Sequence, residues 1–427
     1  MFLFFSTIVC LINTEVERHY TFQGSVLDVF LHIRIENDGK TLINKYNISF
    51  LPDEIGHLGI FYAFNNAKMT RNSSKSLKTV KNEKGVNIYL KSPLKPKEST
   101  NLFIYYTFNS YCKFIRSYIF LNQPIGLLLS IPYTLLSDYP TKKCTTAISG
   151  IEKSQIINVT QSKTNQITES GLFYSSISSE AYERYELEFY TRDPLVRIKE
   201  LNTEVTLSLW GRKRIMNSIV LLNDGPKLLG EFNRVDFNEK TPCHIYSFPL
   251  VLQDETINIW ANDESGRLSQ HLEKQGNTLS IPLRGPVLSG WKSTFNFGWI
   301  GFQSLFCGDN YSILDQPLLK TIPSVIDNFS VQYIFPELTN VVNIKTSVYS
   351  SISVYRKQVN LDWKGRTIVN ISFGSLTTFD IPNIEITYQI PHVAKALKPL
   401  FISFLLLCLF FTIISYRQIF TSKFKTD

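Results

Sequence analysis

The sequence predicts a mainly β protein with two tandem, sandwich-like β domains and one C-terminal transmembrane helix. Aromatic residues that favour strands are abundant, with 31 Phe and 21 Tyr, whereas Met is scarce at three. Apolar and polar residues alternate with a period of two in many segments. A largely apolar run without charged residues fills residues 400–416. The 427 residues, 44% of them hydrophobic, are enough for two β domains.

Period-two alternation identifies individual strands, most clearly in residues 384–390, which Pro391 ends. Four other segments carry apolar residues on one face: Val29, Leu31, Ile33 and Ile35; Leu102, Ile104, Tyr106 and Phe108; Val205, Leu207 and Leu209; and Val369, Ile371 and Phe373. Such strands are half buried in antiparallel sheets. His32 falls on the outer face of the first segment, and we read it as a solvated side chain and not as a metal ligand.

A charged turn around Arg192–Pro194 predicts the boundary between domains spanning residues 15–193 and 194–392. The polar stretches 67–85 and 152–170 read as loops, the second more capable of forming a strand. Repeats at a solenoid period are not visible.

The run after Pro399 lacks charges for about 18 residues, which spans about 27 Å as a helix and suffices for a thin bilayer. We expect a transmembrane helix over residues 397–417 and a short cytosolic tail over 418–427. The alternative, a buried core helix, requires apolar partners on all sides. Within the span, Ser403, Thr412 and Ser415 are the candidates for a stripe that faces a partner helix.

The N-terminal run Phe2–Ile12 is too short to span a bilayer and resembles the apolar region of a signal peptide. We expect a signal peptide over residues 1–14, with cleavage near Thr14; an uncleaved N-terminal anchor is the alternative. A signal followed by one stop-transfer helix predicts a lumenal body. Lys423 and Lys425 stand five and three residues from the end, the spacing of a K-x-K-x-x retrieval signal for the endoplasmic reticulum.

Two groups of residues are candidates for covalent modification in an oxidising lumen. Four cysteines, Cys112, Cys144, Cys243 and Cys307, fit two disulfides. The most economical connectivity pairs Cys112 with Cys144 and Cys243 with Cys307, and free buried thiols are the alternative. Six N-x-S/T sequons are candidates for glycosylation: Asn47, Asn72, Asn158, Asn310, Asn328 and Asn370.

The sequence lacks the motifs of common catalytic sites: H-E-x-x-H, G-x-S-x-G, the P-loop, G-x-G-x-x-G and CxxC are all absent. Cys243 and His244 are adjacent, but neighbouring residues of a strand point to opposite faces, which disfavours a nucleophile pair. Asp263 and Glu264 read as a polar turn and not as paired catalytic carboxylates. The net charge of +8 comes from scattered lysines and does not indicate nucleic acid. We therefore expect neither catalytic residues nor a cofactor.

Four sequence islands resemble the ribophorin I family: Tyr139–Thr141, Trp210–Gly211, Leu228–Phe237 and Leu283–Lys292. The resemblance extends from about residue 15 through the apolar span. It implies two tandem lumenal β domains similar to those of certain zinc aminopeptidases, without their metal site. It also implies a structural role for Trp210, Pro286, Gly290 and Trp291, with each Trp supplying core or interface area.

The resemblance further implies a non-catalytic subunit of the oligosaccharyltransferase complex, which N-glycosylates Asn in N-x-S/T. The subunit is expected to brace a polytopic catalytic subunit, contact other membrane subunits and present acceptor chains. Some family members carry a long cytosolic domain, whereas this chain stops about ten residues after Arg417, so we expect no ribosome docking through it. Two alternatives are a lumenal hydrolase of aminopeptidase ancestry and a cell-surface receptor ectodomain.

Overall fold

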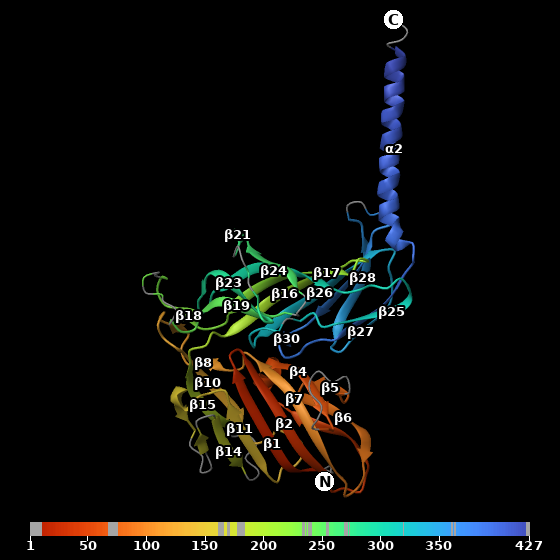
Figure 1. Ribbon diagram of the computed structural model, residues 1–427. Helices are drawn as coiled ribbons and strands as arrows, with labels where there is room; N and C mark the ends of the chain where they lie inside the picture. Colours follow the sequence, from red (N-terminus) through yellow and green to blue (C-terminus); the bar gives the residue numbers. More distant parts are fainter. Residues whose placement is uncertain are drawn as a thin grey trace, which may run out of the picture.

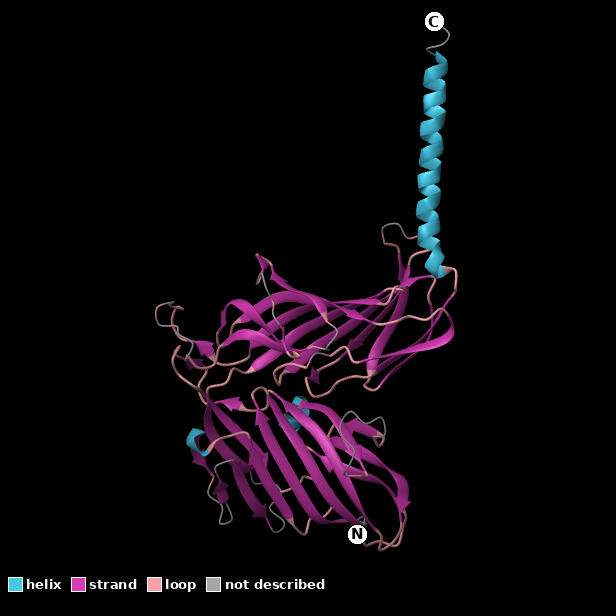
Figure 2. Cartoon of the chain, viewed as in Figure 1, coloured by secondary structure: helices cyan, strands magenta, loops and turns pink. Residues whose placement is uncertain are grey.

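Strands dominate the computed structural model, and a single long helix projects from one end (Figures 1 and 2). The structure describes residues 11–66, 76–160, 166–168, 171–176, 184–232, 235, 237, 241–252, 256–268, 272, 274–318, 320–359, 362 and 364–423. The predicted class, mainly β with one C-terminal membrane helix, is confirmed.

The N-terminal half is built on a seven-stranded sheet with two smaller sheets beside it. In spatial order the large sheet contains β13 (Gln166–Thr168), β14 (Gly171–Ser176), β11 (Cys144–Ser149), β1 (Leu11–Gln23), β2 (Val26–Asn37), β7 (Ser99–Asn109) and β4 (Leu58–Phe64). The smaller sheets contain β12 (Ile156–Val159), β15 (Arg184–Thr191), β10 (Ile125–Pro132) and β8 (Lys113–Phe114), and β3 (Ile43–Ser49), β6 (Gly85–Leu94) and β5 (Thr79–Asn82). Two short helical segments are α1 (Pro52–His57) and a 3₁₀ turn (Lys153–Gln155).

The C-terminal half is built on a nine-stranded sheet, again with two smaller sheets. The large sheet contains β21 (Gly266–Arg267), β20 (Ile257–Asp263), β24 (Lys292–Phe302), β17 (Arg212–Asn223), β16 (Val196–Leu207), β26 (Val325–Glu337), β29 (Arg366–Phe373) and β28 (Ser350–Lys357), with β30 (Leu376–Thr377) on β26. The smaller sheets contain β19 (Ile245–Val251), β23 (Thr278–Val287) and β22 (Lys274–Gln275), and β25 (Gly308–Asp315), β31 (Ile384–Ile390) and β27 (Asn340–Thr346).

The two large sheets repeat one topology. In the first, β1 pairs antiparallel with β2 and parallel with β11; in the second, β16 pairs antiparallel with β17 and parallel with β26. The outer strands correspond as well, since β7 and β4 occupy the places of β24 and β20. Each parallel pair joins segments far apart in sequence, such as Val16 with Cys144. The repeated topology is not accompanied by a repeat that can be recognised in the amino-acid sequence.

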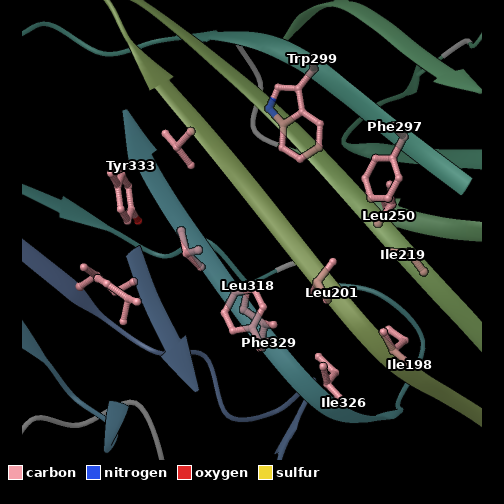
Figure 3. Close-up of a cluster of buried hydrophobic side chains, with 14 of the residues drawn as sticks. Ile198, Leu201, Ile219, Leu250, Phe297, Trp299, Leu318, Ile326, Phe329 and Tyr333 are labelled. Atoms are coloured by element: carbon pink, nitrogen blue, oxygen red, sulfur yellow. The ribbon is translucent and has the colours of Figure 1, made fainter. Parts of the chain in front are cut away.

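Each half has its own hydrophobic core, and the alternating residues of the sequence fill these cores. The apolar residues of β2, β7, β29 and β31 that alternation placed on one face are all buried, which confirms those strands. One core is formed by residues between Leu11 and Leu195 together with Cys243, the other by residues from Val196 to Ala394. Figure 3 shows part of the second core, where Phe297 and Trp299 on β24 lie on one side of strands β17 and β16, and Ile326 and Phe329 on β26 lie on the other side. His32 is on the outer face, half buried and stacked on Phe103.

Cleavage of the expected signal peptide near Thr14 would remove residues 11–14, which are part of β1. Leu11 pairs with Asn37 on β2 and is buried. The Asn13 side chain is fully buried, donates to the Ser137 hydroxyl at 3.0 Å and accepts from the Tyr46 hydroxyl at 2.9 Å. Removal of these residues would leave buried polar groups unpaired. The structure therefore favours a leader that ends before Leu11 over cleavage near Thr14.

A two-stranded sheet and several side chains join the two halves. β9 (Tyr118–Ile119) from the first pairs in parallel with β18 (Lys227–Leu228) from the second. The Ser110 hydroxyl donates to Asp224 at 3.3 Å, and Asn109 donates to the Ser375 hydroxyl at 3.2 Å. A cavity of about 250 Å³ remains at this interface, lined by residues of both halves. Ser110 and Asp224, which form one of these hydrogen bonds, line the cavity.

Candidate functional site at the membrane junction

Helix α2 (Ala394–Lys423) leaves the second β domain directly and extends away from it (Figure 1). Its 24-residue segment Ala394–Arg417 is long and apolar enough to cross a membrane. The apolar stretch within this segment is not buried against the rest of the chain. The alternative of a core helix is therefore wrong. Leu, Ile and Phe on every side of the helix leave an apolar surface that only lipid or another protein can cover.

A network of ion pairs fixes the start of α2 to the large sheet. The Lys398 ammonium lies 2.7 Å from Asp362 Oδ1 and 3.8 Å from Glu337 Oε2. Arg366 at the start of β29 donates from Nε to Asp362 Oδ2 at 3.1 Å, and the backbone N–H of Lys364 donates to Glu337 at 3.1 Å. The two carboxylates therefore neutralise cations from both the helix and the sheet.

The network is partly shielded from water, which strengthens it. The Asp362 side chain is 0% exposed and that of Glu337 is 5% exposed, whereas Lys398 retains 42% exposure. Burial opposes ionisation of Asp362, but the hydrogen bond from Lys398 and the charges of Arg366 and Lys398 outweigh it, so the pKa of Asp362 lies below its usual range. Asp362 is therefore a carboxylate at neutral pH.

The linker before α2 is too short to uncouple the helix from the β body. β31 ends at Ile390 and α2 begins at Ala394, whose side chain is buried against the second core. The backbone N–H of Ala394 also bonds to the Pro391 carbonyl at 3.0 Å. The sequence did not indicate Asp362, Glu337 and Arg366 as partners of the helix, because nothing local in it specifies which charged residues meet α2.

The predicted stripe of Ser403, Thr412 and Ser415 does not form, although all three are exposed on α2. At 3.6 residues per turn, Ser403 and Thr412 lie roughly 180° apart around the helix axis. The Thr412 hydroxyl also donates to the Leu409 carbonyl within the same helix at 2.7 Å. Lys423 is the last described residue of α2, and Lys425 of the candidate retrieval signal lies outside the described residues.

The predicted disulfides are absent, and the alternative of free thiols describes the structure. Cys112, Cys144, Cys243 and Cys307 are all free. The members of the expected second pair are separated, since Cys243 belongs to the first core whereas Cys307 packs against the second. Burial raises the pKa of Cys112 to about 12 and that of Cys243 to about 11. These thiols are therefore small core residues and poor nucleophiles.

The sequons differ in their surroundings. Asn158, Asn310 and Asn328 are exposed, Asn370 is half buried, and Asn72 lies outside the described residues. Asn47 is also half buried, and its amide donates to Asp138 at 2.6 Å. A glycan on Asn47 must break that hydrogen bond, whereas the three exposed asparagines are open to solvent.

The remaining sequence candidates occupy ordinary structural environments. His244 Nδ1 lies 2.6 Å from the Thr241 carbonyl oxygen, and the Cys243 thiol donates to the Thr191 carbonyl, so these two residues do not act as a pair. Asp263 is bonded to Arg284, which lowers its pKa. Groups of three or more metal-ligating side chains do not occur in the part of the chain that the structure describes.

The aromatic and turn residues of the sequence islands lie at or near the surface. Trp210 is 73% exposed and Trp291 is 40% exposed, so neither tryptophan is a core residue. Gly290 has a φ of 81° in the turn before Trp291, a conformation that favours glycine, and Pro286 lies in β23.

Comparison with known proteins gives the chain a family. The family model described as Ribophorin I matches residues 11–417. The chain belongs to the ribophorin I family. The match begins at the first described residue of β1 and ends inside α2, so the family covers both β domains and the span.

Two curated relatives cover nearly the whole chain. Dolichyl-diphosphooligosaccharide–protein glycosyltransferase subunit 1B of Arabidopsis thaliana is 22% identical and covers 96% of this chain and 92% of its own length. Subunit 1B of Oryza sativa subsp. japonica is 23% identical and covers 94% and 90%, respectively. Among solved structures, an M1 zinc metallopeptidase from Deinococcus radiodurans matches 44% of this chain and 42% of its own at 10% identity, with a TM-score of 0.29, which is too low to carry an argument.

Proposed function

We propose that this chain is a subunit of an oligosaccharyltransferase complex, which transfers an oligosaccharide from a dolichyl diphosphate carrier to protein. The proposal is carried by family membership over residues 11–417 together with relatives of nearly the same extent that are named subunit 1 of that enzyme. The apolar helix α2 supports attachment to the membrane in which such a complex resides.

Within the complex, we infer a non-catalytic role as a brace for a polytopic catalytic subunit, together with presentation of acceptor chains. The ion pairs of Asp362 with Lys398 and Arg366 support the bracing role, because they couple α2 to the large sheet without a flexible linker. A partner helix that packs on α2 would thereby set the position of the β body relative to the catalytic subunit. The apolar surface of α2, uncovered within the chain, is available for such packing.

The proposed location is the endoplasmic reticulum membrane, with one span and both β domains in the lumen. Sequons on the exposed surface of both halves, including Asn158 and Asn328, support this orientation because only lumenal segments receive N-glycans. We also infer that the halves are separate domains meeting near residue 195, which the division into two cores supports.

An immuno-isolation experiment tests the proposal. Membranes are solubilised in a mild detergent, and the chain is captured with an antibody against its β domains. The polytopic catalytic subunit and oligosaccharide transfer to an N-x-T peptide should appear in the eluate. Recovery of the chain with neither the polytopic subunit nor transfer activity contradicts the proposal. Recovery with a bound zinc ion and aminopeptidase activity favours the hydrolase alternative.

A further inference from the structure

Six apolar side chains lie exposed or half buried on the segments where the two halves meet. We define this surface, the interdomain patch, as Ile115, Tyr118, Phe120, Leu229, Phe232 and Trp291. Phe232 is half buried, and the other five are between 40% and 55% exposed. Contiguous apolar patches are uncommon on the free surface of a soluble domain and mark interaction sites.

Backbone pairing between the halves assembles the patch. The loop after β8 carries Tyr118 and Phe120 on the outer side of β9, while Ile119 between them is buried. Because β9 pairs with β18 and the Leu229 N–H donates to the Ile119 carbonyl at 2.8 Å, Leu229 lies beside these two aromatic rings. The patch therefore exists only when both halves are folded and joined.

The turn that ends at Trp291 completes the patch. The Trp291 ring meets the Phe232 ring edge to face, with centroids 5.6 Å apart. The turn abuts β18, since a side chain added at Gly290 would lie 3.5 Å from the Lys227 Cα atom. Trp291 and Phe232 come from two of the sequence islands that carry the family resemblance, which gives these islands a shared location on the surface.

Among the described residues, the charges next to the patch are mainly positive. Arg116, Lys227 and Lys292 are exposed, and each is a neighbour of a patch residue in the sequence or in backbone pairing. None of the three forms an ion pair with a described residue. Glu231 is the exposed acid next to Phe232. Aromatic side chains with a cationic rim fit a protein surface that has an apolar centre and acidic edges.

We propose that the interdomain patch docks the lumenal part of another subunit of the complex, through an apolar surface flanked by Asp and Glu. The inference rests on the proposed function, which places the chain in a multi-subunit assembly. A lipid surface fits less well, because β18 lies at the level of the junction between the β domains, whereas α2 leaves the far end of the second domain (Figure 1). The chain would then hold its partners at two remote places, the span and the patch.

Site-specific photo-cross-linking in membranes tests the occupant. A photoreactive phenylalanine analogue at position 120, which is 55% exposed, should cross-link the full-length chain to a lumenal segment rich in Asp or Glu of a complex subunit. The same analogue at Tyr349 is the matched control and should give no such product. Tyr349 is 94% exposed and lies between β27 and β28, at the opposite end of the second half from β18 (Figure 1). Products with lipid or with a second copy of the chain overturn the inference, as does the absence of a product specific to position 120.

A substitution pair tests the energetic role. Trp291→Ala with Phe120→Ser should lower recovery of the lumenal partner at least about tenfold after stringent washing, because aromatic residues dominate binding at such centres. Trp210→Ala, which removes another exposed tryptophan outside the patch, should leave recovery unchanged. Unchanged recovery for the double variant overturns the inference.

The two failures are distinguishable. If the wild-type chain isolates without the polytopic subunit, the proposed function fails. If the wild type isolates with the complex and the double variant retains every subunit, only the patch inference fails. Arg116→Glu keeps the test valid if the double variant misfolds, since this exposed residue contributes no core contact and its charge reversal should also weaken docking. Unchanged docking of Arg116→Glu at low salt likewise overturns the inference.

Discussion

Asp362→Asn is the substitution that most directly tests the coupling between α2 and the large sheet. Asn has nearly the same size but lacks the negative charge that Lys398 and Arg366 neutralise. Breaking a fully buried ion pair costs about 3–5 kcal/mol, whereas an exposed pair contributes less than about 1 kcal/mol. Asp362 is fully buried but its two partners retain 42% and 25% exposure, so we expect an intermediate loss of about 2 kcal/mol.

The expected loss is measurable by thermal unfolding. For a domain of about 150–250 residues, 1 kcal/mol corresponds to a change of about 2–4 °C in Tm, so Asp362→Asn should lower the Tm of the second domain by about 4–8 °C. The assay is tryptophan fluorescence of the full chain in detergent during heating. Glu264→Gln removes an exposed acid in a polar turn and is the matched control. A Tm for Asp362→Asn equal to that of the control refutes the role of the network.

The same variant has a predictable pH dependence. Because the pKa of Asp362 is held below its ordinary value of about 3.9, its ionised form stabilises the folded state above that pH, and the contribution is lost as the pH falls through the lowered pKa. The difference in Tm between wild type and Asp362→Asn should therefore be full at pH 7 and shrink below about pH 4. A difference that grows on acidification contradicts this assignment.

Three further predictions concern the ends and the thiols of the chain. Alkylation without reductant should modify all four cysteines of the β domains after denaturation and leave the buried ones unmodified in the folded protein; resistance after denaturation would reveal disulfides. N-terminal sequencing of the mature chain should begin at or before Leu11, because β1 starts there; a start at residue 15 contradicts the structure. Lys423→Ser with Lys425→Ser should move a fraction of the chain to the cell surface by microscopy, and unchanged retention argues against the retrieval signal.

Local patterns of the sequence were sufficient to predict the elements that local physics decides. Alternation placed the buried side of β2 and β31 correctly because a strand exposes successive side chains to opposite faces. The apolar run identified α2 because a bilayer requires a long segment without charges. Both inferences use only neighbours in sequence.

Long-range pairing was beyond sequence reasoning. The parallel neighbours β1 and β11 join residues such as Val16 and Cys144, and no local signal specifies such a partner. For the same reason Asp362 and Glu337 were missed at the membrane junction, and Trp291 was assigned to core or interface area without a location. The serine and threonine stripe failed for a simpler reason, since helical spacing places Ser403 and Thr412 on opposite sides.

The most direct test of the central claim, that this chain is a subunit of the oligosaccharyltransferase complex, is reciprocal isolation through the polytopic catalytic subunit. Quantitative mass spectrometry of the purified, active complex should find this chain in a fixed ratio to the catalytic subunit, close to one copy each. Its absence from a preparation that retains full transfer activity would contradict the account.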